Sequence, residues 1–258
     1  MLTFICFYRE NYIKEANLGD DMQIVLKKKP KNVTIIEGFP GFGLVGTITT
    51  EYLIDHLKAE KIGYVWFKDM APVLAIHNQT AVDPFGVYYS KKYNLVIMHA
   101  LTNVKGFEWM IADVLKDVAK QLQAKELISI EGVGGMGSEE SKVFYYSKKN
   151  SKRWEKKGVD VLEEGIVIGV TASLIMKLDK TPLSCLFAET QSNLPDSRAA
   201  AKVVEALDNY LGLKVDTKPL LKKAEEFEGK IKTLMESSKE AVKEMKSKQG
   251  DDKLNYLG

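Results

Sequence analysis

The stretch EGFPGFGLVG, residues 37–46, follows the apolar run VTII and contains four glycines. Gly41, Gly43 and Gly46 have the spacing of a dinucleotide-binding loop, and Asp69 follows at about the distance expected of its acidic residue. The apolar run before the loop predicts a strand, and the spacing of apolar residues after it predicts a helix. Such a unit indicates an α/β fold, in which the loop either binds a nucleotide or only makes a tight turn.

The proline inside this loop favours the structural interpretation. Pro40 has no backbone N–H, so it cannot donate a hydrogen bond to a phosphate. A tight strand-to-helix turn needs glycines even where no ligand binds, because some positions require positive φ or close backbone contact. We therefore interpret five residues as a structural glycine loop: Gly38, Pro40, Gly41, Gly43 and Gly46. An NAD-binding oxidoreductase that uses the three spaced glycines and Asp69 is the less favoured alternative.

Outward from the loop, apolar runs alternate with helical patterns. The predicted strands are residues 33–36, 63–67, 72–76, 86–90, 95–101, 127–132 and 183–189. The predicted helices are residues 44–57, 107–124, 169–178 and a last helix that Asp196 caps and that ends at Leu211, before Gly212. This alternation predicts a three-layer α/β/α sandwich around a mostly parallel, mixed sheet. Between residues 63 and 101 the strands follow one another with little helix, so this part should be antiparallel or mixed.

Four predicted strands are followed by or end in polar residues, which form a candidate pocket: Glu37, Asn103, Glu131 and Glu189. The carboxyl ends of such strands meet in the crevice where α/β proteins usually bind ligands. Converging glutamates could act as acid and base in hydrolysis or phosphorolysis. A single strand-end glutamate more often caps a helix or holds a loop. The pattern therefore indicates a pocket but does not name a reaction.

Composition argues against several classes of protein. Lys and Arg total 37 and Asp and Glu total 35, so the net charge is +2, without the basic excess usual in nucleic-acid-binding proteins. Cys6 and Cys185 are the two cysteines and lie far apart, which excludes a Cys-based zinc site and fits a reducing cytoplasm. No apolar run approaches the length of a membrane span. Neither a nucleic acid nor a membrane is therefore an expected partner.

Three blocks of the chain resemble the PAC2 family, the proteasome assembly chaperone 2 family, in their order and separation. They are GFPGFGLVG, EGVGGMGSEE and LFAETQSNLPDSRAAAKVVEALDNYLGLKVDTKPLLKKAEEFE. The likeness covers about Met22 to Lys248, and the last block is the most specific because it joins a strand, an alanine-rich helix and the segment after it.

This resemblance implies a phosphorylase/hydrolase-like α/β/α sandwich whose glycine loop is a fold element with no established nucleotide, so no cofactor is expected. It also implies a relative of a chaperone that helps to build the proteasome core particle. Archaeal members resemble this chain best, since they have the helical extension, and they are homo-oligomers.

The C-terminal segment carries a heptad pattern. After Pro219, apolar or small residues recur in alternating steps of four and three, which is typical of a coiled-coil seam. The pattern predicts a C-terminal helix whose seam either packs back on its own domain, joins copies of the chain or enters a partner's groove. The candidate self-association residues of this seam are Leu220, Phe227, Ile231, Leu234 and Met245.

The last residues form a polar segment that we predict to be flexible. Family members that dock on the proteasome α-ring are expected to end in an apolar residue, a tyrosine and one further residue. This chain ends in Asn255, Tyr256, Leu257 and Gly258, so its tyrosine is third from the end and follows asparagine. Tyr256, Leu257 and Gly258 are the candidate docking tail, with this departure from the family pattern.

We divide the chain into four predicted regions: an N-terminal extension (1–21), a PAC2-like α/β domain (22–213), a helical extension (214–248) and a flexible tail (249–258). The extension either precedes the true start of the domain at Met22 or adds an edge strand.

The expected function is that of a cytoplasmic, non-enzymatic homo-oligomer that binds proteasome α subunits or another assembly factor. The first alternative is an enzyme with a phosphorylase/hydrolase-like pocket that uses Glu37, Glu131 and Glu189.

Overall fold

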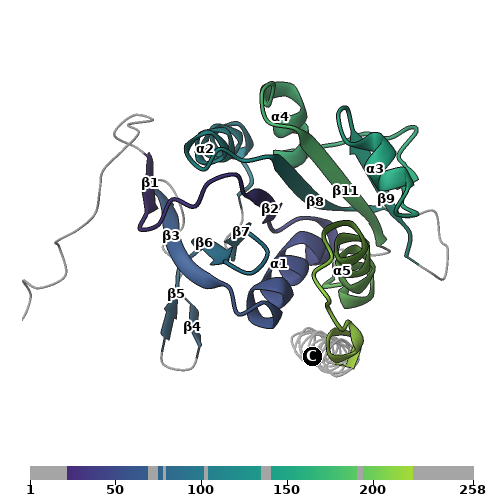
Figure 1. Cartoon of the computed structure of the whole chain (residues 1–258), viewed down its shortest axis with the longest axis horizontal. Helices are drawn as coiled ribbons and strands as arrows, with labels where there is room; N and C mark the ends of the chain where they lie inside the picture. Colours follow the sequence, from purple (N-terminus) through teal and green to yellow (C-terminus); the bar gives the residue numbers. More distant parts are fainter. Residues whose placement is uncertain are drawn as a thin grey trace, which may run out of the picture. The chain divides into compact units, whose positions relative to one another are not determined.

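The computed structural model describes residues 22–68, 75–77, 80–101, 104–134, 141–190 and 194–222. The predicted N-terminal extension lies outside these residues. The chain divides into two compact units, Met1–Thr217 and Lys218–Gly258. The elements labelled in Figure 1 belong to the first unit, and residues 218–222 of the second unit are helical.

Nine strands form one sheet in the order β1-β3-β6-β7-β2-β8-β11-β9-β10. Their bounds are β1 Met22–Leu26, β2 Thr34–Gly38, β3 Glu60–Phe67, β6 Phe85–Ser90, β7 Leu95–Ala100, β8 Glu126–Gly134, β9 Val143–Ser147, β10 Asp160–Val161 and β11 Leu183–Thr190. A separate hairpin pairs β4 (Ala75–His77) with β5 (Thr80–Val82). The predicted mixed sheet of an α/β protein is confirmed.

The centre of this sheet is parallel and most of its flanks are antiparallel. The four strands β7, β2, β8 and β11 run in one direction, and β2 lies between β7 and β8. On one side, β7, β6, β3 and β1 pair antiparallel, and on the other β9 is antiparallel to β11 and parallel to β10. The prediction of antiparallel strands between residues 63 and 101 is therefore confirmed for β3, β6 and β7.

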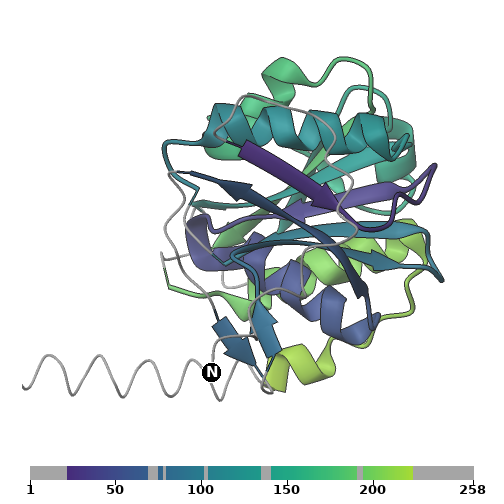
Figure 2. The same ribbon diagram turned by 90° about the vertical axis from the view of Figure 1, so that its left-hand side faces the viewer.

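Helices cover both faces of the sheet and give the three predicted layers (Figure 1, Figure 2). α1 (Val45–His56) and α5 (Ser197–Leu211) pack against each other on one face. α2 (Glu108–Gln121) and α4 (Gly169–Lys177) do the same on the opposite face. Because both faces are covered, every residue of β7 is buried. Among the described residues, no helix combines the length and apolar character that crossing a membrane requires.

The predicted ends of α5 are confirmed. The Asp196 carboxylate accepts a hydrogen bond from the backbone N–H of Ala199 at 2.9 Å, which satisfies a donor that the first helical turn leaves open. Gly212 follows the helix with φ 71°, the left-handed conformation that glycine adopts without a steric penalty.

Five short strands and helices were not predicted: β1, β5, β9, β10 and α3 (Ser151–Glu155). α3 lies in a lysine-rich segment, yet its Trp154 is fully buried and stacks on Tyr210 with 3.6 Å between ring centroids. The indole N–H of Trp154 donates to Ser184 Oγ of β11 at 3.0 Å. Trp154 therefore helps to attach this segment to the sheet, together with Arg153, which donates to the Tyr210 carbonyl oxygen at 3.0 Å.

Candidate functional site

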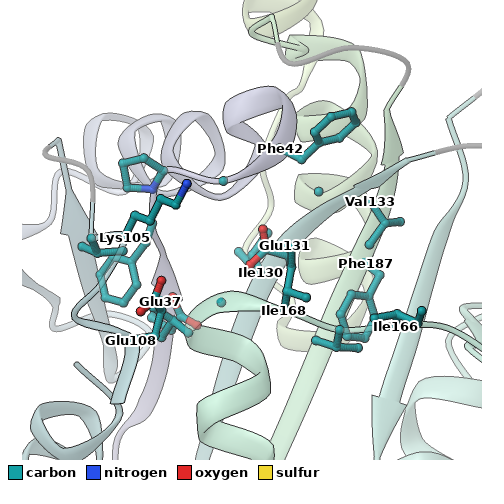
Figure 3. A pocket seen from close by; sticks show the side chains of 18 of the residues that line it. Glu37, Phe42, Lys105, Glu108, Ile130, Glu131, Val133, Ile166, Ile168 and Phe187 are labelled. Atoms are coloured by element: carbon teal, nitrogen blue, oxygen red, sulfur yellow. The ribbon is translucent and has the colours of Figure 1, made fainter. Parts of the chain in front are cut away.

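A cavity of about 570 Å³ lies at the carboxyl ends of β2 and β8 (Figure 3). The glycine loop, the start of α2 and the segment before α4 complete its walls. Most of the side chains that line it are apolar, among them Phe39, Phe42, Val104, Ile130, Ile168 and Phe187. This is the edge of the sheet where α/β folds usually bind ligands.

The glycine loop brings α1 close to the sheet. A Cβ atom on Gly38 would lie 2.2 Å from the Gly46 carbonyl oxygen, and one on Gly46 would lie 2.9 Å from the Ile130 carbonyl oxygen. Gly43 has φ 64°, a left-handed conformation that larger residues rarely adopt. From Gly41 the chain passes through a short 3-10 turn, η1 (Phe42–Leu44), into α1.

A carboxylate occupies the space beside the first glycine of the dinucleotide-like spacing. A Cβ atom on Gly41 would lie 2.3 Å from Glu131 Oε1. A dinucleotide loop brings its backbone close to an anionic pyrophosphate, and Glu131 would repel that group. Asp69, the acidic residue of the same hypothesis, lies outside the described residues. The geometry at Gly41 therefore disfavours a dinucleotide at this loop.

Glu37 lies on β2 and is 1% exposed, so its carboxyl group is removed from water. Burial raises the pKa of Glu37 from 4.5 to about 8, a hydrogen bond from Ser129 opposes this rise, and the charge of Glu131 adds to it. Ser129 lies opposite Glu37 on β8, and its hydroxyl donates to Glu37 Oε1.

Glu131 lies two residues beyond Ser129 on β8, and its carboxyl group faces the cavity (Figure 3). Burial raises the pKa of Glu131 from 4.5 to about 7. Hydrogen bonds from the Thr171 hydroxyl and the Phe42 backbone N–H oppose this rise. Thr171 Oγ1 lies 3.3 Å from Glu131 Oε2 and 2.8 Å from Ser129 Oγ. A chain of hydrogen bonds thus connects the two glutamates.

The structure brings together two of the four residues of the predicted pocket. Glu37 and Glu131 both line the cavity. Glu189 lies on β11 opposite Val133, is partly exposed and does not line the cavity. Asn103 lies outside the described residues.

The other predicted sites are in the C-terminal unit. Leu220 is buried, with 5% of its surface exposed. The other seam residues (Phe227, Ile231, Leu234 and Met245) and the tail residues (Tyr256, Leu257 and Gly258) lie outside the described residues.

Sequence reasoning missed Ser129 and Thr171, the two hydroxyl groups between the glutamates. Ser129 could have been predicted from the sequence, because residues two apart on a strand share a face and Ser129 lies two residues before Glu131. Thr171 could not have been predicted, since it lies in the first turn of α4, far from both glutamates in sequence. His99 belongs to the opposite side of the sheet, where its Nδ1 lies 2.8 Å from Thr50 Oγ1 of α1.

Comparison with known proteins identifies close similarities over most of the chain. The model of the PAC2 family matches residues 35–235. The structure of Pyrococcus furiosus PbaA, described as an archaeal homolog of proteasome-assembly chaperone, is 31% identical, with a TM-score of 0.77 over 88% of this chain and 97% of PbaA. Pyrococcus furiosus PbaB, described as an archaeal proteasome activator, is 25% identical, with a TM-score of 0.71 over 83% and 99% of the two chains. An uncharacterized protein of Methanocaldococcus jannaschii is 28% identical over 84% of this chain and 92% of its own.

Proposed function

The chain belongs to the PAC2 family, and from this premise we propose that it is a non-enzymatic, assembly-chaperone-like protein of the cytoplasm. In this proposal it self-associates and binds proteasome α subunits or a related assembly factor. The observation that carries the proposal is the likeness to PbaA, which extends over 97% of that chain at 31% identity. The similarity to PbaB, an activator of the proteasome by its description, supports a proteasome-related partner in general.

Self-association is assigned to the heptad seam of the C-terminal helix. On the predicted C-terminal helix, apolar or small residues in steps of four and three make a stripe that only Ser238 interrupts, in a segment otherwise rich in Lys and Glu. Such a stripe is stable in water only when another surface covers it. We assign a second copy of the chain to that role, so that the seam residues (Leu220, Phe227, Ile231, Leu234 and Met245) hold the oligomer together.

Partner binding is assigned to the tail. Tyr256 offers a rigid apolar ring with a hydroxyl group, a combination that suits an anchor residue in a partner's pocket. The carboxylate of Gly258 suits capture by a lysine or by backbone N–H groups. One short tail binds weakly, but several tails on one oligomer bind together through their effective concentration.

The test is a pull-down of proteasome α subunits by the tagged full-length chain and by a variant that lacks residues 254–258. The full-length chain should retain α subunits, and the truncated chain should lose them while its oligomer and melting temperature stay unchanged. If both chains retain the α subunits equally, the tail does not bind them. If neither chain retains them, α subunits are not the partner.

An enzyme with a phosphorylase/hydrolase-like pocket is the second candidate. The cavity and the raised pKa values of Glu37 and Glu131 favour it. The position of Glu189 outside the cavity lining weakens the enzyme hypothesis. An active site that uses Glu37, Glu131 and Glu189 needs all three carboxyl groups in one place.

A further inference from the structure

The cavity beside the glycine loop has an open, apolar entrance and a polar interior. Ile166 and Ile168, which line it, are 92% and 74% exposed, so the cavity reaches the surface of the protein. Glu37, at 1% exposed, lies at its inner end, and Glu131 lies on the neighbouring strand. A ligand in this cavity would place an apolar body against the walls and a polar group against the two carboxyl groups.

Hydrogen bonds connect these two carboxyl groups through two hydroxyl groups. Three links join Glu37 to Ser129, Ser129 to Thr171, and Thr171 to Glu131. The Ser129 hydroxyl donates to Glu37 and the Thr171 hydroxyl donates to Glu131, so each carboxyl group accepts a hydrogen bond.

The charge of Glu131 acts on Glu37, so the two carboxyl groups titrate as a coupled pair. The raised pKa values of both groups agree with a proton held near neutral pH. With one proton bound, the pair carries one negative charge in a largely apolar cavity.

In the described parts of the first unit, no salt bridge joins Glu37 or Glu131 to a cationic side chain. Among the described residues, three other titratable groups face the pair or the cavity around it. They are Cys185 of β11, Glu108 at the start of α2 and Lys105 before it. Glu108 and Lys105 have opposite charges, so they leave the excess of one negative charge unchanged.

We propose that this cavity binds a small organic cation, a primary amine with an aryl or alkyl body. The ammonium group would donate hydrogen bonds to the Glu37 and Glu131 carboxyl groups, and the body would contact the apolar walls. An anion of the same size would be repelled by the pair, and a neutral alcohol would lack the charge attraction. This site is independent of the chaperone proposal, because it uses neither the seam nor the tail.

The experiment compares three probes that share one phenyl body but differ in charge: 2-phenylethylamine, 2-phenylethanol and 3-phenylpropionate. Isothermal titration calorimetry with the full-length chain should give a Kd of about 1 mM or below for the amine. The alcohol and the carboxylate should bind at least about tenfold more weakly. Equal affinity for the amine and the alcohol, or no amine binding at about 10 mM, would overturn the proposal.

Two variants locate the binding site, and a third serves as their control. Glu131→Gln and Glu37→Gln keep the shape of the side chain, and each should weaken amine binding at least about tenfold. Glu189→Gln removes a carboxylate from the adjacent strand, outside the cavity lining, and should bind the amine like the parent chain. Melting curves of each variant establish that it is folded, and unchanged amine affinity in either folded cavity variant would overturn the assignment.

The dependence of amine binding on pH gives a second readout. Loss of the bound proton makes the pair more negative, so amine affinity should rise between about pH 6 and about pH 8.5. Glu131→Gln, which removes one of the two titrating groups, should flatten this rise. An affinity that falls over this range would contradict a cation held by the pair.

Discussion

At the scale of single residues, the glycines at the end of β2 determine how closely α1 approaches the sheet. Gly38→Ala should lower the free energy of unfolding by about 1–3 kcal/mol, the usual cost of overpacking. Its new Cβ would lie 2.2 Å from the Gly46 carbonyl oxygen, which is backbone and cannot move without α1. Gly134→Ala, at the end of β8, is the matched control, because its Cβ would meet nothing within 4 Å. Urea denaturation measures both, and equal effects would contradict the close approach.

The buried carboxyl group of Glu37 makes stability depend on pH. Its pKa rises from 4.5 to about 8 on folding, so the folded chain holds a proton that the unfolded chain releases. This contribution to stability is fully present below about pH 4.5 and is lost as the pH rises through about 8. Between about pH 5 and about pH 8.5, Glu37→Gln should therefore lose less unfolding free energy than the parent chain. An equal loss in Glu37→Gln and in the parent chain would contradict the burial argument.

Part of the cavity was predictable from single residues. Glu37 and Glu131 follow apolar runs in the sequence, and the carboxyl ends of neighbouring parallel strands meet at one edge. The same logic failed for Glu189, because a strand end sets the edge of the sheet but not the direction in which a side chain points. Thr171 was not predictable, since only tertiary packing brings α4 to β8.

At the scale of elements, the N-cap of α5 offers a direct test of local stabilisation. Asp196→Ala should lower the free energy of unfolding by about 0.5–2 kcal/mol, because the Ala199 N–H loses its acceptor. Asp196→Asn should keep most of the stability, since asparagine also caps helices. Asp179→Ala, an exposed aspartate outside the helices, is the control and should change the melting temperature little. A fully stable Asp196→Ala variant would contradict the capping role.

The heptad seam of the C-terminal segment, which is predicted from the sequence, gives a second prediction at this scale. Ile231→Glu with Leu234→Glu would bury unpaired charges if the seam joins copies of the chain. The mass from light scattering should then fall toward the 29.0 kDa of one chain, while the circular dichroism of the α/β domain persists.

Thr233→Glu with Ser237→Glu is the matched control, because it adds two glutamates at positions off the seam. This variant should keep the parent mass. If the seam variant keeps the mass of the parent oligomer, self-association depends on the α/β domain instead.

Long periodic elements were predictable, and short ones were not. α2 and α5 contain several turns, so their apolar spacing is visible in the sequence. β10 has two residues and α3 has five, too few to show a period. α3 is fixed instead by Trp154, whose partners Tyr210 and Ser184 come from distant parts of the chain.

At the scale of the whole molecule, the order of strands was not visible in local patterns. β2 lies between β7 and β8, although long segments separate these strands in the sequence. Apolar runs indicate which strands are buried, but they do not say which strands are neighbours. The three PAC2-like blocks implied a three-layer sandwich but not the order of its strands, and the family match over residues 35–235 confirms the resemblance.

The most direct test of the central proposal is native mass spectrometry of the full-length chain mixed with purified proteasome α subunits. We predict a complex that contains several copies of this chain together with α subunits. The cavity variant Glu131→Gln should form the same complex, because the cavity and the tail are separate in this account. Spectra that contain only the separate components, over the whole accessible concentration range, would contradict a role as a proteasome assembly chaperone.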